Sequence, residues 1–544
     1  MEKVKEFLQG VEVDQRTAAL LTAAAGAVGA VVLLVHKLYI HQDAKAKIQK
    51  ARNRRTASLQ RAEHAVLRYK TSHPGNDSAF ILALSLSELT KKLQEGLLSP
   101  EDVLYSYMEK ALDVNKDLNC CTGILLESFD QLKTSNKEGL LYGVPISIKE
   151  NYAYKNHDSS CGVIINLDQP AKKDSVLVQV LKRQGAIPFV KTNLPQGLLS
   201  YDCGNPIYGQ TVNPHSLQKT SGGSSGGEGA LIGGGGSLLG LGSDVGGSIR
   251  IPASFCGICG FKPTAGRLSS LGLSPIYRGQ KSVPSCPGPM ARDVDSLALC
   301  MEALLCDHMF ALDPTVPPIP FNVQTYQSSQ PLRIGYLEND REVKALLEQA
   351  GHTAHIVLMI PYCLYFREGC PLDPCLRFQV LPYYLPSWLK KTLSVVLKML
   401  VSSLLLSVEN LWKQHAAIED YIQETIAEWR RCNIDVLLCP VIGPAYNLFY
   451  CGKLTCFASY TILYNLLNFP AGVVTVSTVK AEDEEELEHY KGVYGDYIDK
   501  YFKQAVSGGE GLPMAVQCVS LPWQDEHCLR FMKEVEQLVK QSTV

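Results

Sequence analysis

The sequence predicts an α/β protein that follows a single apolar helix near its N-terminus. From residue 86 onward, apolar residues at helical spacing alternate with short apolar runs typical of buried strands. An uncharged stretch of 18 residues, AALLTAAAGAVGAVVLLV (18–35), precedes them. With 544 residues, 46% of them hydrophobic and 19% charged, the chain has ample material for a buried core.

The N-terminal region, residues 1–40, is expected to hold a transmembrane helix at about 18–36. Acidic residues before the stretch, and the lack of a small-residue cleavage site, disfavour a signal peptide. A buried core helix is a further alternative. Many lysines and arginines follow it, so the positive-inside tendency places the rest of the chain in the cytosol. We therefore expect a single-pass membrane protein, in the endoplasmic reticulum or another endomembrane.

The spacing of apolar residues predicts the elements that follow. Residues 41–78 are expected to be a basic helical segment that ends in the linker TSHPGNDS (71–78). Helices are predicted at 86–114, 175–180 and 295–305, and strands at 141–148, 186–190, 332–336, 434–440, 473–476 and 512–519. The acidic run EDEEELE (482–488) is expected to be a solvated surface.

Charge and cysteine content argue against several classes of protein. The net charge is −2, whereas a general nucleic-acid binder needs a clustered basic surface, so we expect no nucleic acid partner. The 18 cysteines are scattered, as in a cytosolic protein with reduced thiols. Cys256 and Cys259 have no second pair at zinc spacing, and no histidines form an HExxH motif. We therefore expect neither a metal nor a cofactor.

A glycine-rich stretch from Gly222 to Pro252 holds 13 glycines in 31 residues. A glycine inside a helix or strand costs about 1 kcal/mol relative to alanine, so we expect this stretch to avoid regular structure. Its backbone N–H groups would then approach a ligand or a developing charge. A flexible linker is the alternative, but interspersed apolar residues and the ending SIRIP (248–252) disfavour it.

Three kinds of chemistry compete for this stretch. A phosphate-binding loop would require the motif G-x-x-x-x-G-K-[ST] or G-x-G-x-x-G, and the stretch contains neither. The segment GGSSG (222–226) matches the G-x-S-x-G nucleophile elbow, which must follow a buried strand, but the residues before it, NPHSLQKTS (213–221), are polar. In the third interpretation, a serine in GGS (246–248) lies where consecutive backbone N–H groups can line an oxyanion site. The spacing alone identifies no base for that serine.

The sequence resembles the amidase signature family, in blocks that follow the family order. These blocks are GVPISIKEN (143–151), GGSSGGEGA (222–230), GSDVGGSIRIP (242–252), GPMARDV (288–294), DVLLCP (435–440) and YNLLNFPAGVV (464–474). The N-terminal anchor and the apolar, lysine-containing region after Trp388 are similar to those of membrane-bound members that hydrolyse fatty acid amides. The resemblance implies a mixed central β-sheet surrounded by α-helices, and a homodimer. Residues 79–544 would form the catalytic domain, in which residues 385–407 form a membrane-interacting helical cap.

The resemblance also implies the site residues. Ser248 matches the nucleophile, Ser224 the bridging serine of a cis-peptide turn, and Lys149 the general base. The backbone of Val245, Gly246, Gly247 and Ser248 matches the oxyanion hole, and Asp244 and Arg250 match charged supports of the loop. Lysine has a reference pKa of about 10.4, so this base needs burial to become neutral. The position of Lys149 at the end of an apolar run alone favours a lysine whose amine reaches water. The resemblance favours burial at this strand end instead.

The expected function is that of a membrane-anchored serine hydrolase. It would cleave fatty acid amides (N-acylethanolamines and primary fatty amides) to a free fatty acid and an amine or ammonia, through an acyl-enzyme. The partners would be the lipid amide and the bilayer. One alternative is an amidase for polar substrates, similar to an amidotransferase subunit. Another is a catalytically impaired variant with a binding or regulatory role, because residues 341–381 depart from the family pattern.

Overall fold

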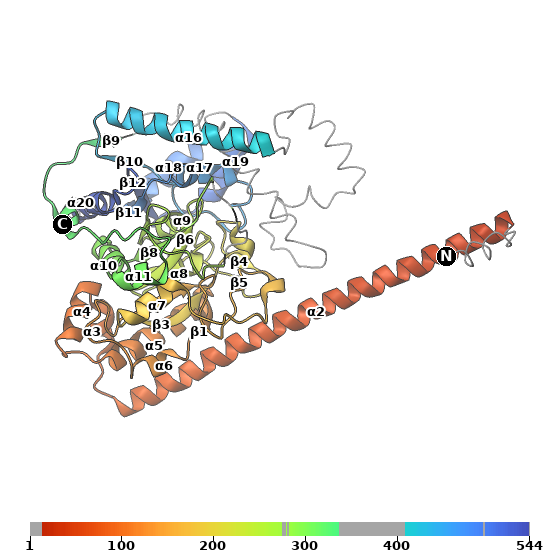
Figure 1. The fold of residues 1–544 in the computed structure, drawn as a ribbon, viewed down its shortest axis with the longest axis horizontal. Coiled ribbons are helices and arrows are strands. Elements are labelled where there is room, and N and C mark those ends of the chain that lie inside the picture. Colours follow the sequence, from red (N-terminus) through yellow and green to blue (C-terminus); the bar gives the residue numbers. More distant parts are fainter. Residues whose placement is uncertain (1–13, 275–278, 280–281, 337–407, 493–494, 543–544) are drawn as a thin grey trace.

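A mixed sheet of ten strands forms the centre of the protein, with helices on both of its faces (Figure 1). The computed structural model describes residues 14–274, 279, 282–336, 408–492 and 495–542. The predicted α/β class, with a mixed central sheet surrounded by helices, is confirmed. The expected cap at 385–407 and the divergent segment 341–381 lie outside the described residues.

The sheet has the strand order β1-β3-β2-β6-β8-β7-β11-β12-β10-β9. Its strands are β1 (Cys121–Ile124), β2 (Pro145–Lys149), β3 (Ile187–Thr192), β6 (Leu239–Asp244), β7 (Cys259–Lys262), β8 (Cys286–Ala291), β9 (Ile334–Tyr336), β10 (Val436–Pro440), β11 (Ala471–Thr478) and β12 (Pro513–Ser520). β2 runs parallel to both β3 and β6, and β9 runs parallel to β10. The remaining neighbours are antiparallel, and β4 (Gly204–Asn205) and β5 (Gly209–Gln210) form a separate small sheet.

The helices that surround the sheet include those expected from the sequence. They are α3 (Ser78–Ala83), α4 (Leu86–Gln94), α5 (Pro100–Leu118), α6 (Ser128–Gln131), α7 (Val176–Arg183), α8 (Gly226–Gly233), α9 (Arg250–Cys256), α10 (Val294–Leu304), α11 (Asp307–Leu312), α12 (Val323–Gln327), α16 (Val408–Arg431), α17 (Ser459–Leu466), α18 (Ala481–His489), α19 (Tyr497–Val506) and α20 (Asp525–Ser542). The start of α5 shows why they form: Ser99 caps it through Asp102 N–H, and Pro100 occupies its first turn. The acidic run at 482–488 lies on α18, which has no buried residue.

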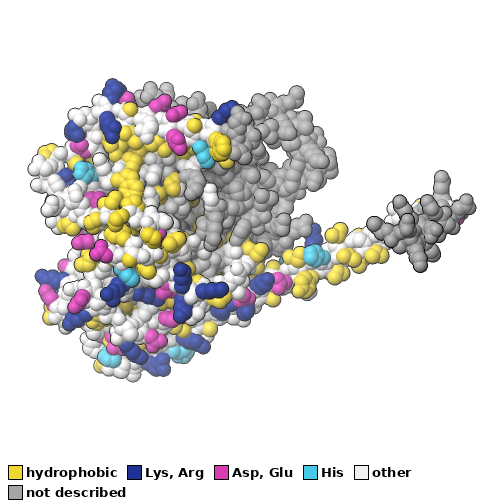
Figure 2. Space-filling view, in the orientation of Figure 1, with side chains coloured by type: hydrophobic (Ala, Val, Ile, Leu, Met, Phe, Trp, Pro, Cys, Tyr) yellow, Lys and Arg dark blue, Asp and Glu magenta, His cyan; other side chains and the backbone are white. Residues whose placement is uncertain are grey.

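The long helix α2 (Gln15–Ser72) joins the apolar stretch and the basic segment without a break. The boundary expected at residue 40 therefore falls inside a helix. Within the described residues, α2 is the helix that is long and apolar enough to span a bilayer. Its N-terminal part extends away from the body of the protein, and hydrophobic side chains follow this part (Figures 1 and 2).

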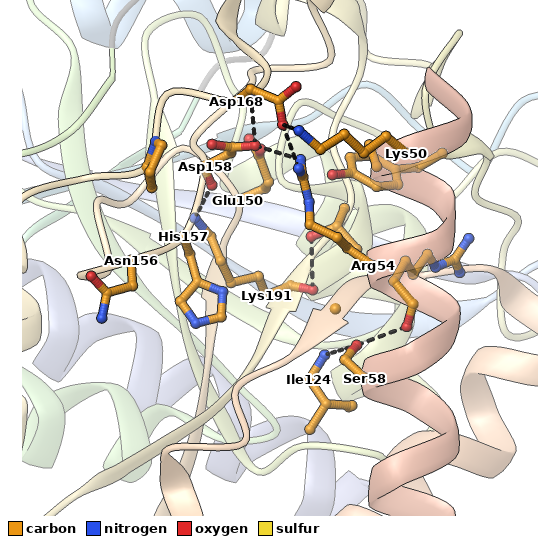
Figure 3. Close-up of a pocket in the computed structure, with 16 residues that line it drawn as sticks. Lys50, Arg54, Ser58, Ile124, Glu150, Asn156, His157, Asp158, Asp168 and Lys191 are labelled. Atoms are coloured by element: carbon orange, nitrogen blue, oxygen red, sulfur yellow. Dashed lines mark hydrogen bonds and ion pairs between the residues drawn. The ribbon is translucent and has the colours of Figure 1, made fainter. Parts of the chain in front are cut away.

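The C-terminal part of α2 is docked on the body beside the edge strand β1. Ala51 and Ala62 are buried there, and the Ser58 hydroxyl accepts a hydrogen bond of 3.1 Å from Ile124 N–H. The Arg54 guanidinium lies between two carboxylates, at 2.7 Å from Asp158 and 2.5 Å from Asp168 (Figure 3). These contacts cover an otherwise open sheet edge with a helix.

The glycine-rich stretch does form regular structure, contrary to expectation. It contains α8, β6 and the start of α9. Glycines of α8 approach protein backbone closely: a Cβ on Gly227 would collide with the backbone of Asn193, and one on Gly229 would lie 3.0 Å from the Pro252 carbonyl oxygen. Close packing of α8 against its neighbours is therefore the reason for these glycines, and it outweighs their low helix propensity.

Candidate active site

Two parallel strands, β2 and β6, bring the candidate residues to one edge of the sheet. β2 ends at Lys149 and β6 ends at Asp244, and the strands are neighbours in the sheet. The carboxyl ends of parallel strands meet at the same edge, where loops are free to build a site. The loop that follows β6 carries Val245 to Ser248. Lys149, which precedes Asp244 by 95 residues, is thereby placed beside the second half of the glycine-rich stretch.

The Lys149 side chain is fully buried and hydrogen-bonded to serines. Its Nζ lies 2.7 Å from Ser224 Oγ, 3.0 Å from Ser243 Oγ and 3.2 Å from the Ser243 carbonyl oxygen. Among the described residues, none of its hydrogen bonds goes to a carboxylate. A neutral amine has two N–H donors and one lone pair, so it can donate to Ser243 and accept the proton of the Ser224 hydroxyl.

Burial sets the charge of this lysine. Desolvation lowers the pKa of Lys149 to about 7, and the charges of Asp244 and Glu228 offset only part of that effect. The ammonium form has too few compensating charges inside the protein, so a large fraction of Lys149 is neutral near pH 7. The expectation that Lys149 is buried at a strand end is met, and the alternative of a lysine that reaches water is excluded.

Ser224 lies just before α8, and the peptide bond between Gly223 and Ser224 is cis. The next residue connects the two ends of the glycine-rich stretch: Ser225 N–H donates a hydrogen bond of 3.0 Å to the Ser248 carbonyl oxygen. Ser225 Oγ also accepts from Ser243 N–H at 3.3 Å. The structure thus brings Ser224, Ser248 and the Lys149 contact residue Ser243 into one group.

The loop between β6 and α9 presents backbone N–H groups on the side of Ser248. Gly247 N–H donates to Asp244 Oδ1 at 2.8 Å, so this amide of the expected oxyanion hole is already occupied. The amides of Val245, Gly246 and Ser248 make no hydrogen bond within the described part of the chain. Gly247 has a φ of +115°, a left-handed conformation that favours glycine. A Cβ on Gly246 would be in ordinary van der Waals contact with the Ile462 side chain, at 3.6 Å.

Asp244 and Arg250 form a buried ion pair that fixes this loop. Arg250 Nη2 lies 3.0 Å from Asp244 Oδ1, and both side chains are fully buried. Burial alone would raise the pKa of Asp244, but the Arg250 guanidinium and the backbone N–H of Ile249 hold it well below its usual range. Asp244 therefore stays charged and holds the loop, and it is not suited to exchange protons at neutral pH.

Three further residues brace the loop, and reasoning from the sequence gave none of them a role. Asn465 accepts from Arg250 at 2.6 Å and donates to Asp244 at 2.9 Å, and Gln517 accepts from Arg250 at 2.7 Å. The Thr461 hydroxyl donates to the Gly246 carbonyl oxygen at 2.7 Å. Asn465 lies in the block YNLLNFPAGVV, which was a signal for it, whereas only the fold places Gln517 of β12 here.

The chain belongs to the amidase family: residues 102–529 match the family model, which is well over half of the chain. It is therefore an amide hydrolase, as the sequence predicted. Within the described residues, no group of three or more His, Cys, Asp or Glu side chains is arranged to hold a metal ion.

Individual relatives show which members of the family this chain is similar to. The chain is 48% identical to "Fatty-acid amide hydrolase 1" of Sus scrofa, over 91% of this chain and 93% of the relative. It is 46% identical to "Vitamin D3 hydroxylase-associated protein" of Gallus gallus, over 77% of this chain and 99% of the relative. A solved structure of a fatty acid amide hydrolase has a TM-score of 0.72 at 23% identity, covering 91% of this chain and 95% of that one, and supports the fold.

Proposed function

We propose that this amidase hydrolyses fatty acid amides at a membrane surface, with Ser248 as the nucleophile, Ser224 as the relay and Lys149 as the base. The observation that carries the catalytic part is the 2.7 Å contact between a fully buried lysine and the Ser224 hydroxyl. The substrate class is supported by the 48% identity to the Sus scrofa fatty-acid amide hydrolase over most of both chains.

The proton relay follows from the charge state of the lysine. Neutral Lys149 takes the proton of the Ser224 hydroxyl, and Ser224 takes that of Ser248 as its oxygen attacks the amide carbonyl carbon. The same path then returns a proton to the leaving nitrogen, the C–N bond breaks, and an acyl-enzyme on Ser248 remains. Water repeats the attack with the same base and releases the carboxylic acid. Protonation of the nitrogen is needed because an amine anion is a very poor leaving group.

The negative charge that develops on the carbonyl oxygen needs fixed donors. The amides of Val245, Gly246 and Ser248 are the candidates, whereas Gly247 N–H serves the loop through its bond to Asp244. The ion pair between Asp244 and Arg250 and the brace from Thr461 hold these amides in place before substrate arrives. Such preorganisation lowers the barrier because the donors do not have to reorient during the reaction.

The apolar part of α2 supports a membrane location. It is exposed in the structure, and its length and composition suit a bilayer span. The basic residues that follow it favour a catalytic domain on the cytosolic side. An anchor of this kind keeps the site close to substrates dissolved in the bilayer, which a hydrolase of polar amides does not require.

Covalent labelling tests the assignment of the nucleophile. A fluorophosphonate probe should label the full-length, detergent-solubilised protein at Ser248, as located by peptide mass spectrometry. Labelling should be lost in Ser248→Ala and should persist, more slowly, in Ser224→Ala. Modification of Ser224 in the unmutated protein would contradict the assignment.

A series of amides with increasing acyl chain length tests the substrate class. For a lipid amide hydrolase, kcat/KM should rise steeply from a short polar amide to a long-chain one, because each buried CH₂ contributes about 0.8 kcal/mol. The Ser248→Ala variant provides the background rate. Equal values of kcat/KM along the series would point to an amidase for polar substrates.

A further inference from the structure

The glycine-rich stretch contains a buried acid that the proposed relay does not use. Glu228, in the first turn of α8, is fully buried. It accepts hydrogen bonds from the Ser147 hydroxyl at 2.5 Å and from the Thr192 hydroxyl at 2.7 Å. Both partners flank the base, because Ser147 precedes Lys149 by two residues on β2 and Thr192 is the partner of Lys149 on β3.

Two contacts attach the segment at the start of α8 to β2. Residues two apart on a strand face the same side, about 6.6 Å from each other. Ser224 lies two residues before α8 and Glu228 lies in its first turn, so both belong to the segment at the start of this helix. Ser224 contacts Lys149 and Glu228 contacts Ser147, so this segment is attached to β2 at two points. Glu228 therefore fixes the position of α8 on β2, and with it the position of the relay serine against the base.

A glycine of β6 leaves room for this acid. Gly240 is the partner of Ser147 in the sheet, and a Cβ there would collide with both the Glu228 carboxylate and the Ser147 hydroxyl. The carboxylate is thus packed against the backbone of β6, on the same side of the sheet as the relay. This arrangement gives a structural reason for the glycine at position 240.

We propose that Glu228 is a positioning residue that holds Ser224 against Lys149 and, through its own charge, sets the pH range in which Lys149 acts as a base. This inference rests on the proposed function of Lys149. A negative charge beside the lysine favours the ammonium form, and a neutral carboxylic acid does not. Protonation of Glu228 would therefore make the base available at lower pH.

Glu228 is the one group facing Lys149, among the described residues, whose charge is suited to change near neutral pH. The groups that act on the lysine are Asp244, Cys161, Cys203 and Glu228. Burial raises the pKa of the Cys203 thiol to about 12 and that of Cys161 further, so both stay neutral. Arg250 keeps Asp244 charged. Burial raises the pKa of Glu228 to about 7, although hydrogen bonds from Ser147 and Thr192 and the charge of Lys149 oppose the shift.

The test is the rate at which a fluorophosphonate labels Ser248 as a function of pH. We expect Glu228→Gln, which keeps an acceptor and removes the charge, to move the acid limb of the profile about one pH unit lower. Thr192→Val, of the same shape but without the hydroxyl, should move it in the same direction by less, because the carboxylate ion loses a donor. Asp313→Asn is the matched control, since that buried acid also accepts from two hydroxyls, those of Ser269 and Thr315, outside the site.

The controls separate this inference from the function on which it rests. Asp313→Asn should retain the acid limb of the unmutated protein even where its melting temperature falls. An acid limb in both folded Glu228→Gln and folded Thr192→Val that coincides with that of the unmutated protein would overturn the inference. If instead Lys149→Ala retained the full profile, the base assignment itself would fail, whatever Glu228→Gln showed.

Discussion

Two buried basic side chains, Arg250 and Lys149, lie at the same edge of the sheet, and their partners differ. Arg250 has a carboxylate partner, Asp244, at 3.0 Å, and amide oxygens from Asn465 and Gln517 complete its hydrogen bonding. Lys149 has hydroxyl and carbonyl oxygens from serines as partners. Both side chains are fully buried. The difference is that Arg250 has a carboxylate partner and Lys149 has none among the described residues.

This contrast shows how one fold keeps a fixed charge and a neutral amine close together. A paired charge in the interior stays charged, and removal of its partner is strongly destabilising. An amine without a direct counter-ion loses its proton instead, because desolvation penalises the charged form. Arg250 therefore holds the loop, and Lys149 is free to accept a proton. Removing the counter-charge of Arg250 and removing the amine of Lys149 should therefore have opposite effects on stability.

The largest expected effect is on catalysis. Lys149→Met removes the base and retains the bulk of the side chain, so kcat should fall by roughly 10²- to 10⁴-fold, the usual contribution of a general base. Hydrolysis of a long-chain amide by the folded variant measures it. Lys219→Met is a matched control, because Lys219 is also buried but donates to backbone carbonyl oxygens at the end of α19. An equal loss of activity in the two variants would contradict the role of Lys149 as the base.

The next effect is on stability at the paired cation. Asp244→Asn leaves Arg250 buried without its counter-charge, so the free energy of unfolding should fall by about 3–5 kcal/mol. Chemical denaturation followed by far-UV circular dichroism measures the change. A loss below about 1 kcal/mol, as is typical of an exposed ion pair, would mean that the charge of Asp244 is not needed inside the protein.

A smaller effect on stability, of opposite sign, is expected at Lys149. Lys149→Met should raise the free energy of unfolding by about 1–2 kcal/mol at neutral pH, because it removes a buried group that is kept for function. The folded pKa of Lys149 is lowered to about 7, below that of the unfolded chain. The unfolded state therefore holds more protons between pH 7 and the ordinary lysine value, and unmutated stability rises with pH in that window. The gain in Lys149→Met should be largest below it and disappear above it.

The smallest effect is expected at the surface, where α2 docks. Arg54 is 44% exposed and is paired with Asp158 and Asp168. Because water screens such pairs, Arg54→Ala should lower the free energy of unfolding by at most about 1 kcal/mol, and less at high salt. Thermal unfolding at two salt concentrations checks this. A loss as large as that of Asp244→Asn would show that burial does not govern the value of these ion pairs.

The sequence was sufficient for the elements and for part of the site. Apolar runs located β2 and β3, and Ser99 with Pro100 marked the start of α5. These elements are predictable because their signals lie within a few consecutive residues. The resemblance to the amidase family supplied the triad residues. Lys149 was recognisable as a lysine at the end of an apolar run, whereas its hydrogen bond to Ser224 joins positions 75 residues apart in the sequence.

The remainder depends on contacts that local patterns do not encode. Glycines were expected to avoid helix and strand, but in α8 and β6 they allow close packing that compensates for their low propensity. The brace from Gln517 requires β12 to lie near α9, which only the sheet order determines. Glu228 lies in the block GGSSGGEGA, which by itself gives the acid no role, and its contacts form only when the fold places β2 and β3 beside α8.

The central claim is that Lys149 works as a neutral base because it is buried without a direct counter-ion. Its most direct test is the dependence of kcat/KM on pH for a long-chain amide, in the unmutated protein and in Lys149→Ala. The unmutated profile should fall on the acid side with an apparent pKa near that of Lys149, about 7, and the slow residual reaction of Lys149→Ala should have its optimum at higher pH. An identical acid limb in the two proteins would contradict the claim.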